Sequence, residues 1–349
     1  MYSNPYFDGP RLLADIGGTN ARFALERGKG EIDEVVTLAC ADYTEFAHAV
    51  QAYLERCARV PIRHAIVAIA NPVSGDRIKM TNHHWEFSID ATRRVLNLDT
   101  MLVVNDFAAL AMAVPALEHQ QCEQIGGGTA RPQGVIGLVG AGTGLGVAGL
   151  IPATGRWLTL ESEGGHVAFS PSDERELAVL QFCWQRYEHV SAERLVSGPG
   201  ITLIYEALAA QQATPAQASL DTATIVAHAL NGSDPLCRET IDCFCGMLGT
   251  VAANVAVTLC AKGGIYIGGG IVPRLGDYFA RSPFRARFES KGRFSTFNAQ
   301  IPSFVITAPF PAFLGASTIL AEYLENNPRD TYTMNLAVIE AGVDASLRE

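Results

Sequence analysis

Short apolar runs and helically spaced apolar residues alternate along the first third of the chain. The runs "HAIVAIA" (64–70) and "MLVVND" (101–106) are of strand length, which is typical of buried parallel strands. The stretches "TEFAHAVQAYLERCA" and "FAALAMAVPAL" instead repeat apolar residues every three or four positions, which predicts two helices, the first capped by Thr44. Strands that alternate with helices in this way predict the α/β class.

Two glycine-rich turns each lie between apolar runs. They occur in "RLLADIGGTNARFALE" (11–26) and "VIGLVGAGTGLGVAGLI" (135–151), and the runs after the turns lack helical spacing. Each stretch therefore predicts a β-hairpin. The second echoes the first, which suggests two lobes that each open with a strand, a glycine turn and a strand. A length of 349 residues also favours two domains.

The second half of the chain contains a long, mostly helical region and a final helix. Helical spacing dominates residues 174–260, and "GGIYIGGGIVPRL" (263–275) is typical of a strand that ends in three glycines. The last helix includes "GASTILAEYL" and ends before Pro328, which cannot continue it. The pattern does not predict a structure for residues 327–349.

The composition indicates a globular protein that binds a small molecule. Hydrophobic residues make up 48% of the chain and charged residues 18%, enough apolar material for a core. A net charge of -10 disfavours nucleic acid and anionic membranes as partners. We find no apolar stretch of about 18 residues and no signal peptide, so we expect a cytoplasmic protein.

The eight cysteines include no C-x-x-C pair, so we expect reduced core thiols. The closest approach to a metal-binding pair is "CFC" at Cys243 and Cys245. Its side chains diverge on a helix, which favours core packing over metal binding.

The two hairpin turns have the residue types of a phosphate site. Neither turn matches the P-loop or the dinucleotide-binding fingerprint. Glycines without Cβ atoms let backbone N–H groups approach phosphate oxygens, and threonine hydroxyls add donors. The residues concerned are Gly17, Gly18, Thr19, Gly142, Thr143 and Gly144.

Two such hairpins facing each other would hold a triphosphate from both sides. Asp15, at the end of the first strand, could then bind Mg²⁺ through water, because Mg²⁺ favours few carboxylates and keeps its hydration. The alternative is a pair of ordinary tight turns. For one loop that alternative is favoured by roughly two to one, and two matched loops reverse the preference.

Asn105 and Asp106 end a strand that the pattern buries. A buried charge is costly unless it is held, so the pair should lie where the strand leaves the core. Either the two residues cap the next helix or they do chemistry. Both are compatible with an ionised Asp106, since a helix N-terminus favours negative charge.

Six motifs in order resemble the proteobacterial-type glucokinase family, within the hexokinase and actin-like ATPase superfamily. They are "LADIGGTNARFAL", "VVNDFAALAMAVPAL", "GAGTGLGVAGL", "ESEGGHVAF", "SAERLVSGPG" and "GGIYIGGGIVPR". The resemblance covers residues 11 to about 325. It implies a two-lobed ribonuclease H-like fold with a cleft, with residues 1–116 plus 307–326 as a small α/β domain and 117–306 as a large one. It also implies glucose, ATP and Mg²⁺ as ligands and a homodimer as the assembly.

The resemblance also implies roles for single residues. Asp106 would be the general base toward the sugar 6-hydroxyl, and Asn105 would hold the sugar. The further sugar ligands would be Glu163, His166 and Glu193, the phosphate turn would include Asn20, and Gly268 and Gly269 would form the adenosine-binding turn. Taken singly, each has an ordinary structural alternative, such as a helix cap, a solvated charge or a tight turn.

Three features near these motifs qualify the resemblance. Ala168 and Ser170 replace the Asp and Ala often found in the family, and we expect a mild effect. The loop "TNHHW", with Asn82, matches a family loop near the cleft, and its histidine pair has no evident third metal ligand. The cysteine cluster and helix-turn-helix of the repressor-type sugar kinases have no counterpart in this sequence, which argues against zinc and DNA roles.

Two other functions remain open at this point. The first is a kinase for another hexose, such as mannose, fructose or an amino sugar. The second is a non-enzymatic actin-like ATPase, whose ATP turnover no sugar would stimulate.

Overall fold

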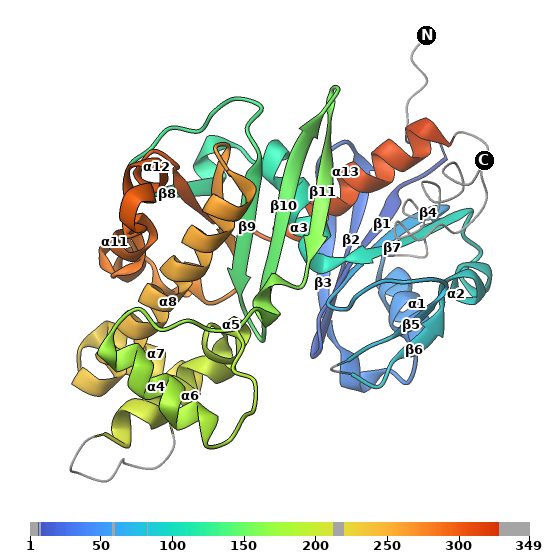
Figure 1. Ribbon diagram of the computed structural model, residues 1–349. Helices are drawn as coiled ribbons and strands as arrows, with labels where there is room; N and C mark the ends of the chain where they lie inside the picture. Colours follow the sequence, from blue (N-terminus) through green and yellow to red (C-terminus); the bar gives the residue numbers. More distant parts are fainter. Residues whose placement is uncertain (1–5, 7, 58–59, 82, 212–219, 328–349) are drawn as a thin grey trace, which may run out of the picture. The chain divides into compact units, whose positions relative to one another are not determined.

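The computed structural model describes residues 6, 8–57, 60–81, 83–211 and 220–327, so the predictions for Asn82 and for residues 328–349 lie outside the described residues. The chain divides into two compact units (Figure 1). Unit 1 is Met1–Ala116 with Pro309–Glu349, and unit 2 is Leu117–Ala308.

Unit 1 is built on a five-stranded sheet. Its strand order is β3-β2-β1-β4-β7, in which β1, β2 and β3 are antiparallel and β1, β4 and β7 are parallel. The elements of unit 1 are β1 (Arg11–Ile16), β2 (Asn20–Gly28), β3 (Glu31–Ala39), η1 (Cys40–Asp42), α1 (Phe46–Arg56), β4 (His64–Ile69), β5 (Arg77–Lys79), β6 (Glu86–Ser88), α2 (Ile89–Val95), β7 (Thr100–Asn105), α3 (Asp106–Ala113), η2 (Val114–Ala116) and α13 (Pro311–Asn326).

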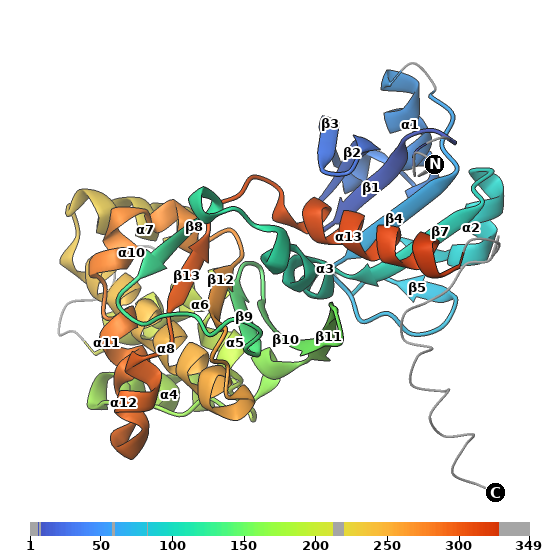
Figure 2. The ribbon, with the colours of Figure 1, turned by 90° about the horizontal axis from the view of Figure 1, so that it is seen from above.

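Side chains of the central strands point alternately to two covered faces. On one face Phe46 and Tyr53 of α1 stack on Phe23 of β2. Helix α13 lies across β1 and β4 on the other side of these strands from α1 (Figure 2) and packs on α3. The predicted cap of α1 is wrong: Glu45 precedes the helix without a side-chain bond, and the Thr44 hydroxyl instead pairs with its neighbour His48 at 3.0 Å.

Unit 2 repeats the strand order of unit 1 and adds one strand. Its sheet runs β11-β10-β9-β12-β13-β8, with the first three strands antiparallel and β9, β12 and β13 parallel. The two glycine-turn hairpins predicted from the sequence, β1-β2 and β9-β10, are therefore confirmed as equivalent parts of two similar sheets. The elements of unit 2 are η3 (His119–Gln121), β8 (Cys122–Ile125), β9 (Ile136–Ala141), β10 (Leu145–Ala153), β11 (Arg156–Ser162), η4 (Gly164–His166), α4 (Glu174–Trp184), α5 (Ala192–Leu195), α6 (Gly198–Ala209), α7 (Thr222–Asn231), α8 (Pro235–Leu259), β12 (Gly264–Gly268), α9 (Val272–Leu275), α10 (Asp277–Arg281), α11 (Phe284–Glu289), η5 (Gly292–Phe294), α12 (Ser295–Ala299) and β13 (Ser303–Ile306).

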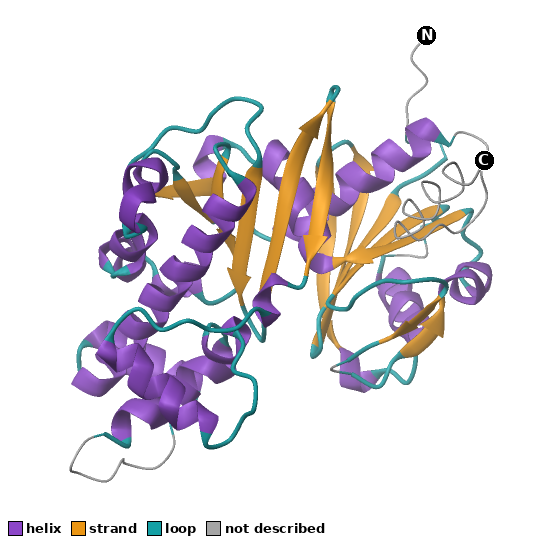
Figure 3. Ribbon diagram, viewed as in Figure 1, coloured by secondary structure: helices purple, strands orange, loops and turns teal. Residues whose placement is uncertain are grey.

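Helix α8 is the centre of the helical part of unit 2 (Figure 3). It packs on α6, α7, α11 and β9, and 72% of its most apolar 18-residue window is buried. The sequence expectation that no stretch reaches membrane-spanning length is wrong for this helix, because it is long and apolar enough by composition. Its burial against the rest of unit 2 accounts for that apolarity.

The cysteines largely follow the core prediction. Six are buried, among them Cys243 and Cys245 of α8, which are fully enclosed. Cys122 is partly buried, and Cys260 is exposed at the left-handed end of α8, so the core prediction is wrong for that residue. All eight are free thiols, as predicted.

Candidate active site

In unit 1 the carboxyl ends of the parallel strands gather the predicted residues at one sheet edge. The pairing register aligns Ile16 with Ile69, and Ile69 with Asn105. Adjacent strands lie about 4.8 Å apart, so the glycine turn after β1 and the Asn105–Asp106 pair after β7 are separated by about 10 Å. Ligands of open α/β sheets bind at such edges.

The first glycine turn is held by backbone bonds. The Gly17 N–H donates to the Asn20 carbonyl at 3.0 Å, and the Thr19 carbonyl accepts from Cys40 N–H at 2.9 Å. Thr19 is exposed at the tip. A Cβ at Gly17 would meet Asn20 O at 3.6 Å, an ordinary contact, so the fold does not itself require glycine there. Close approach of a ligand to the backbone is a physical reason for glycine at such a position.

Asp15 is paired with a residue that the sequence reasoning missed. Its Oδ2 accepts from Arg22 Nη1 at 2.9 Å across the hairpin. Desolvation raises the pKa of the Asp15 carboxyl, and the Arg22 guanidinium opposes that shift. The hairpin register could have indicated this pair, because Asp15 and Arg22 are direct cross-strand partners. The carboxylate is a hard oxygen donor, as Mg²⁺ requires, and Arg22 occupies one of its two oxygens.

Asn105 and Asp106 form the N-terminus of α3. Asn105 Oδ1 accepts from Phe107 N–H at 2.9 Å and from Ala108 N–H at 3.1 Å, so Asn105 is the N-cap. Its Nδ2 donates to the Asn71 carbonyl at 3.4 Å. Asp106 Oδ1 accepts from Phe107 N–H at 2.8 Å and the residue is half-buried. The capping alternative therefore applies to Asn105, and the Asp106 carboxylate lies in the first turn of the helix.

In unit 2 the second glycine hairpin and the predicted adenosine turn lie side by side. Strands β9 and β12 pair Gly140 with Gly268, so the turns that follow them leave the same edge. Gly269 has φ +81°, and a Cβ there would lie 2.3 Å from Ala141 O. Only glycine fits at that position, and the turn at Gly269 lies directly against the last residue of β9, where the hairpin turn begins.

The hairpin tip is braced from one side and open on the other. The Gly142 carbonyl accepts from Gly198 N–H at the start of α6, and the Gly142 N–H donates to the Gly144 carbonyl, both at 2.8 Å. Thr143 is exposed at the tip. A Cβ at Gly142 would meet nothing within 4 Å, so Gly142, like the first glycine of the other turn, is not demanded by packing.

Three of the predicted sugar ligands come together in unit 2. Glu163 precedes η4, His166 ends it, and Glu193 lies in α5. His166 Nε2 is 3.8 Å from Glu163 Oε2 and 3.9 Å from Glu193 Oε1. All three remain partly or largely exposed, with Glu193 the least exposed at 33% of its side chain. The arrangement presents two carboxylates and an imidazole to one volume, which suits a polyhydroxylated ligand.

A short backbone bridge fastens the two segments that carry these residues. Ala192 N–H donates to the Val167 carbonyl at 2.8 Å, and Phe169 N–H donates to the Val190 carbonyl at 2.9 Å. The ring of His189, which sequence reasoning missed, lies with its Nε2 3.1 Å from the His166 carbonyl. No sequence signal identified this contact, because it depends on how the two segments pair.

Ala168 and Ser170 line a cavity of about 350 Å³ under the loop that carries His166. Its walls are mostly apolar, and they include Val251 and Leu259 of α8. Neither carboxylate of the predicted sugar site lines it. The mild effect expected from these two departures stays a prediction.

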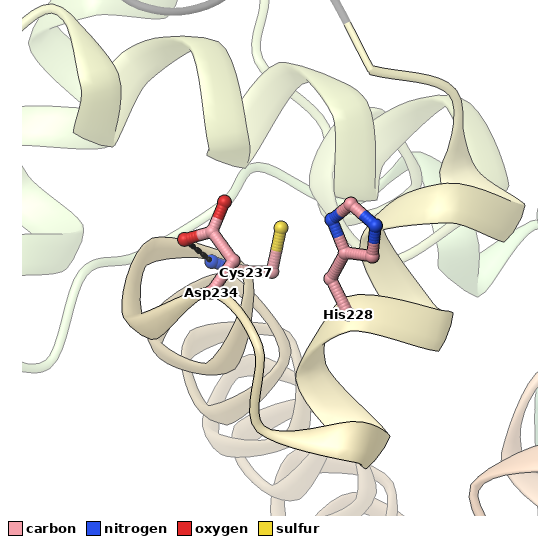
Figure 4. A group of neighbouring side chains, drawn as sticks. All are labelled: His228, Asp234 and Cys237. Atoms are coloured by element: carbon pink, nitrogen blue, oxygen red, sulfur yellow. Dashed lines mark hydrogen bonds between the residues drawn. The ribbon is translucent and has the colours of Figure 1, made fainter.

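A group of possible metal ligands lies elsewhere in unit 2. Donor atoms of His228, Asp234 and Cys237 lie within 4.8 Å of one another (Figure 4). Asp234 Oδ1 caps α8 by accepting from Leu236 N–H at 2.8 Å and Cys237 N–H at 3.3 Å. Burial, and then the Asp234 carboxylate, raise the pKa of the Cys237 thiol to about 12. Metals bind the thiolate form of cysteine, which the raised pKa disfavours here, and Mg²⁺ prefers oxygen ligands. The three residues are therefore better explained as a capped helix end than as the binding site for Mg²⁺.

Comparison with known proteins gives a consistent family signal. The family model described as Glucokinase matches residues 12–323. The chain is 49% identical over 324 residues to a glucokinase of Neisseria gonorrhoeae, covering 93% of this chain and 98% of that protein. It is 59% identical over 319 residues to the bifunctional protein glk of Paraburkholderia xenovorans, covering 91% of this chain and 50% of that protein. The chain thus spans about half the length of the first curated relatives it matches.

A solved structure extends the similarity to three dimensions. The crystal structure of a glucokinase from an Antarctic psychrotroph aligns with a TM-score of 0.79 and 35% identity, covering 90% of this chain and 99% of that one. The predicted two-lobed hexokinase-like α/β fold is confirmed by this likeness.

Proposed function

Because the chain belongs to the glucokinase family, we propose that it transfers the γ-phosphoryl group of ATP to O6 of glucose, giving glucose 6-phosphate and ADP. One observation carries this proposal beyond the family. Gly17 and Gly142, at equivalent turns of two similar sheets, are glycines that the fold does not need. The N–H groups of Gly17 and Gly142 bond within their turns, so the role of these two glycines is to leave room for a polyphosphate to approach the other backbone N–H groups of the turns.

The sugar is bound by groups whose hydrogen-bonding capacity suits hydroxyls. The carboxylates of Glu163 and Glu193 accept from sugar hydroxyls, and His166 and the amide of Asn105 complete the set. The amide oxygen of Asn105 is committed to capping α3, so its remaining role toward the sugar is that of a donor through Nδ2. A misplaced hydroxyl would leave a carboxylate unpaired, which disfavours epimers of glucose.

Asp106 is the general base. Its carboxylate accepts the proton of the sugar 6-hydroxyl as O6 attacks the γ-phosphorus and the bond from that phosphorus to the β,γ-bridging oxygen of ATP breaks. A carboxylate in the first turn of a helix is a weak base. That is sufficient here, because phosphoryl transfer depends mostly on positioning and charge neutralisation.

The nucleotide is bound by both glycine turns. In unit 1 the phosphate-binding residues would be Gly17, Gly18, Thr19 and Asn20, and in unit 2 they would be Gly142, Thr143 and Gly144, with Gly268 and Gly269 leaving room for the adenosine. Asp15 would hold Mg²⁺ through water, and the metal when bound neutralises charge on the phosphates. We further propose that the protein is a cytoplasmic homodimer.

ADP formation by the purified chain tests the proposal. We expect ADP release that needs glucose, stops on chelation of Mg²⁺, and is weaker with mannose, fructose or glucosamine. Preference for one of those sugars would reassign the acceptor. ATP turnover that no sugar stimulates would contradict the kinase function.

A pair of variants tests the nucleotide turn specifically. Gly142→Ala adds a methyl group where the fold leaves space, so we expect normal stability and a KM for ATP raised about tenfold or more. Gly127→Ala is the matched control, since its Cβ also meets nothing within 4 Å and it lies outside the turn. An unchanged KM for ATP in Gly142→Ala would contradict the placement of the phosphates.

A further inference from the structure

We propose that Glu193 also positions the nucleotide-binding hairpin, because its carboxylate holds the turn in place. The hairpin and the sugar-binding residues of unit 2 are then rigidly connected through this side chain. This inference rests on the proposed function. It assigns to one side chain a positioning role for ATP in addition to its role toward the sugar.

The first evidence is a direct bond from Glu193 to the hairpin. Leu145, the residue at which the hairpin turn re-enters the sheet, donates its N–H to Glu193 Oε2 at 2.8 Å. The two residues are 48 positions apart, so this contact is tertiary rather than local. A hydrogen bond from a backbone N–H to an ionised carboxylate is among the stronger ones that proteins form.

The second evidence is the closeness of the carboxylate to Gly144. A Cβ at Gly144 would lie 2.4 Å from Glu193 Oε2 and 3.2 Å from its Cδ. Gly142, two positions earlier, has no such neighbour. The glycine at 144 therefore makes room for the Glu193 carboxylate, whereas the glycine at 142 leaves open space.

The loop of the other sugar ligands packs on the same residue of the hairpin. A Cβ at Gly165, between Glu163 and His166, would lie 2.1 Å from the Leu145 carbonyl oxygen. A Cβ at the preceding Gly164 would lie 2.8 Å from Val147 Cβ. The double glycine of "EGGH" thus lets the sugar loop lie flat on the start of β10, directly after the nucleotide turn.

The two carboxylate oxygens of Glu193 therefore have different neighbours. Oε2 is committed to the Leu145 N–H, and Oε1 lies 3.9 Å from His166 Nε2, toward the proposed sugar volume. A carboxylate anchored through one oxygen presents the other in a fixed direction. Removing it should loosen the hairpin even when no sugar is present, and this consequence separates a brace from a residue that binds sugar only.

Binding of a non-hydrolysable ATP analogue to the sugar-free protein, measured by calorimetry with Mg²⁺, tests the inference. We expect Glu193→Ala to weaken analogue binding about tenfold, as for loss of a charge-assisted hydrogen bond. Glu193→Gln keeps an oxygen that accepts from Leu145 N–H and should stay within about threefold of the wild type. Glu163→Ala is the matched control, because that carboxylate belongs to the sugar set and lies beside His166 rather than on the hairpin, and its analogue affinity should not change.

The outcomes separate the two claims. Wild-type analogue affinity in Glu193→Ala, with weakened glucose binding, would overturn the bracing role and leave the kinase function intact. Failure of the wild-type protein to bind the analogue would overturn the proposed function and this inference with it. Thermal unfolding of each variant shows that the folded protein is being compared, and recovery of affinity in Glu193→Gln is the result that a general folding defect would not give.

Discussion

Helix α13 packs closely on α3, the helix whose first turn carries Asp106, and this close packing depends on Gly315. A Cβ at Gly315 would lie 1.7 Å from the Ala109 carbonyl oxygen and 2.8 Å from Ala113 N. These are backbone atoms of α3, which cannot rotate away as a side chain can. Because Asp106 is in the first turn of the same helix, we predict that Gly315→Ala lowers both the stability of the protein and its turnover.

The magnitude follows from two opposed effects. Alanine in place of a helical glycine gains about 1 kcal/mol through the unfolded state and helix propensity. To relieve the contact at Ala109, however, α13 must withdraw by more than about 1 Å, and overpacking of this kind costs about 1–3 kcal/mol or more. Because the contacted atoms are backbone, we take the upper part of that range, a cost of about 2–3 kcal/mol. The net destabilisation is then about 1–2 kcal/mol, which lowers Tm by about 2–8 °C.

Thermal unfolding and glucose-dependent ADP formation measure the two effects, with Gly246→Ala as the matched control. Gly246 is also inside a helix, but a Cβ there would meet its nearest neighbour, Glu176 Oε1, at 3.7 Å, an ordinary contact. The control should therefore be as stable as the wild type or slightly more stable. If Gly315→Ala gained stability as the control does, the account of this helix crossing would be wrong.

Three further predictions concern the charged and thiol groups. Burial raises the pKa of Asp15, so the folded chain holds a proton there where the unfolded chain has lost it. The contribution of Asp15 to the free energy of unfolding should therefore fall as pH rises above about 4. In Asp15→Asn the free energy of unfolding should change less over that pH range, and parallel pH curves for the variant and the wild type would contradict this prediction. Glu26 is fully buried with Arg11 3.9 Å away, so Glu26→Ala should cost about 3–5 kcal/mol by urea unfolding, and a loss below about 1 kcal/mol would refute this. Iodoacetamide at pH 8 should modify exposed Cys260 first, because burial raises the pKa of Cys245 to about 12; mass spectrometry showing equal rates would contradict the burial.

The elements with a strong local pattern could be predicted from the sequence. The hairpins around the two glycine turns were predicted as the structure has them, since apolar runs and turn glycines act locally. The strand predicted over 101–106 is present but ends one residue earlier, at Asn105, because Asp106 begins α3. The Thr44 cap was not, because several residues near a helix start can bond locally and composition does not choose among them. The apolarity of α8 reflects the many elements that pack around it. The composition of one segment does not show whether such neighbours or a membrane will surround it.

The site residues divide in the same way. Asp106 and the glycines were found through their motifs, and Arg22 could have been found through the hairpin register. The bond from Leu145 to Glu193 could not, because it joins segments that only tertiary pairing brings together. Close approaches at Gly144 are equally hidden, since a glycine in a sequence does not reveal which group occupies the space beside it.

The general-base role of Asp106 is tested most directly by the kinetics of Asp106→Asn. The asparagine oxygen can still accept from Phe107 N–H, so α3 and glucose binding should be preserved. We predict glucose affinity within about threefold of the wild type and a kcat lowered about 100-fold or more, the scale for losing a positioned base. A kcat close to that of the wild type, with glucose bound normally, would contradict the account.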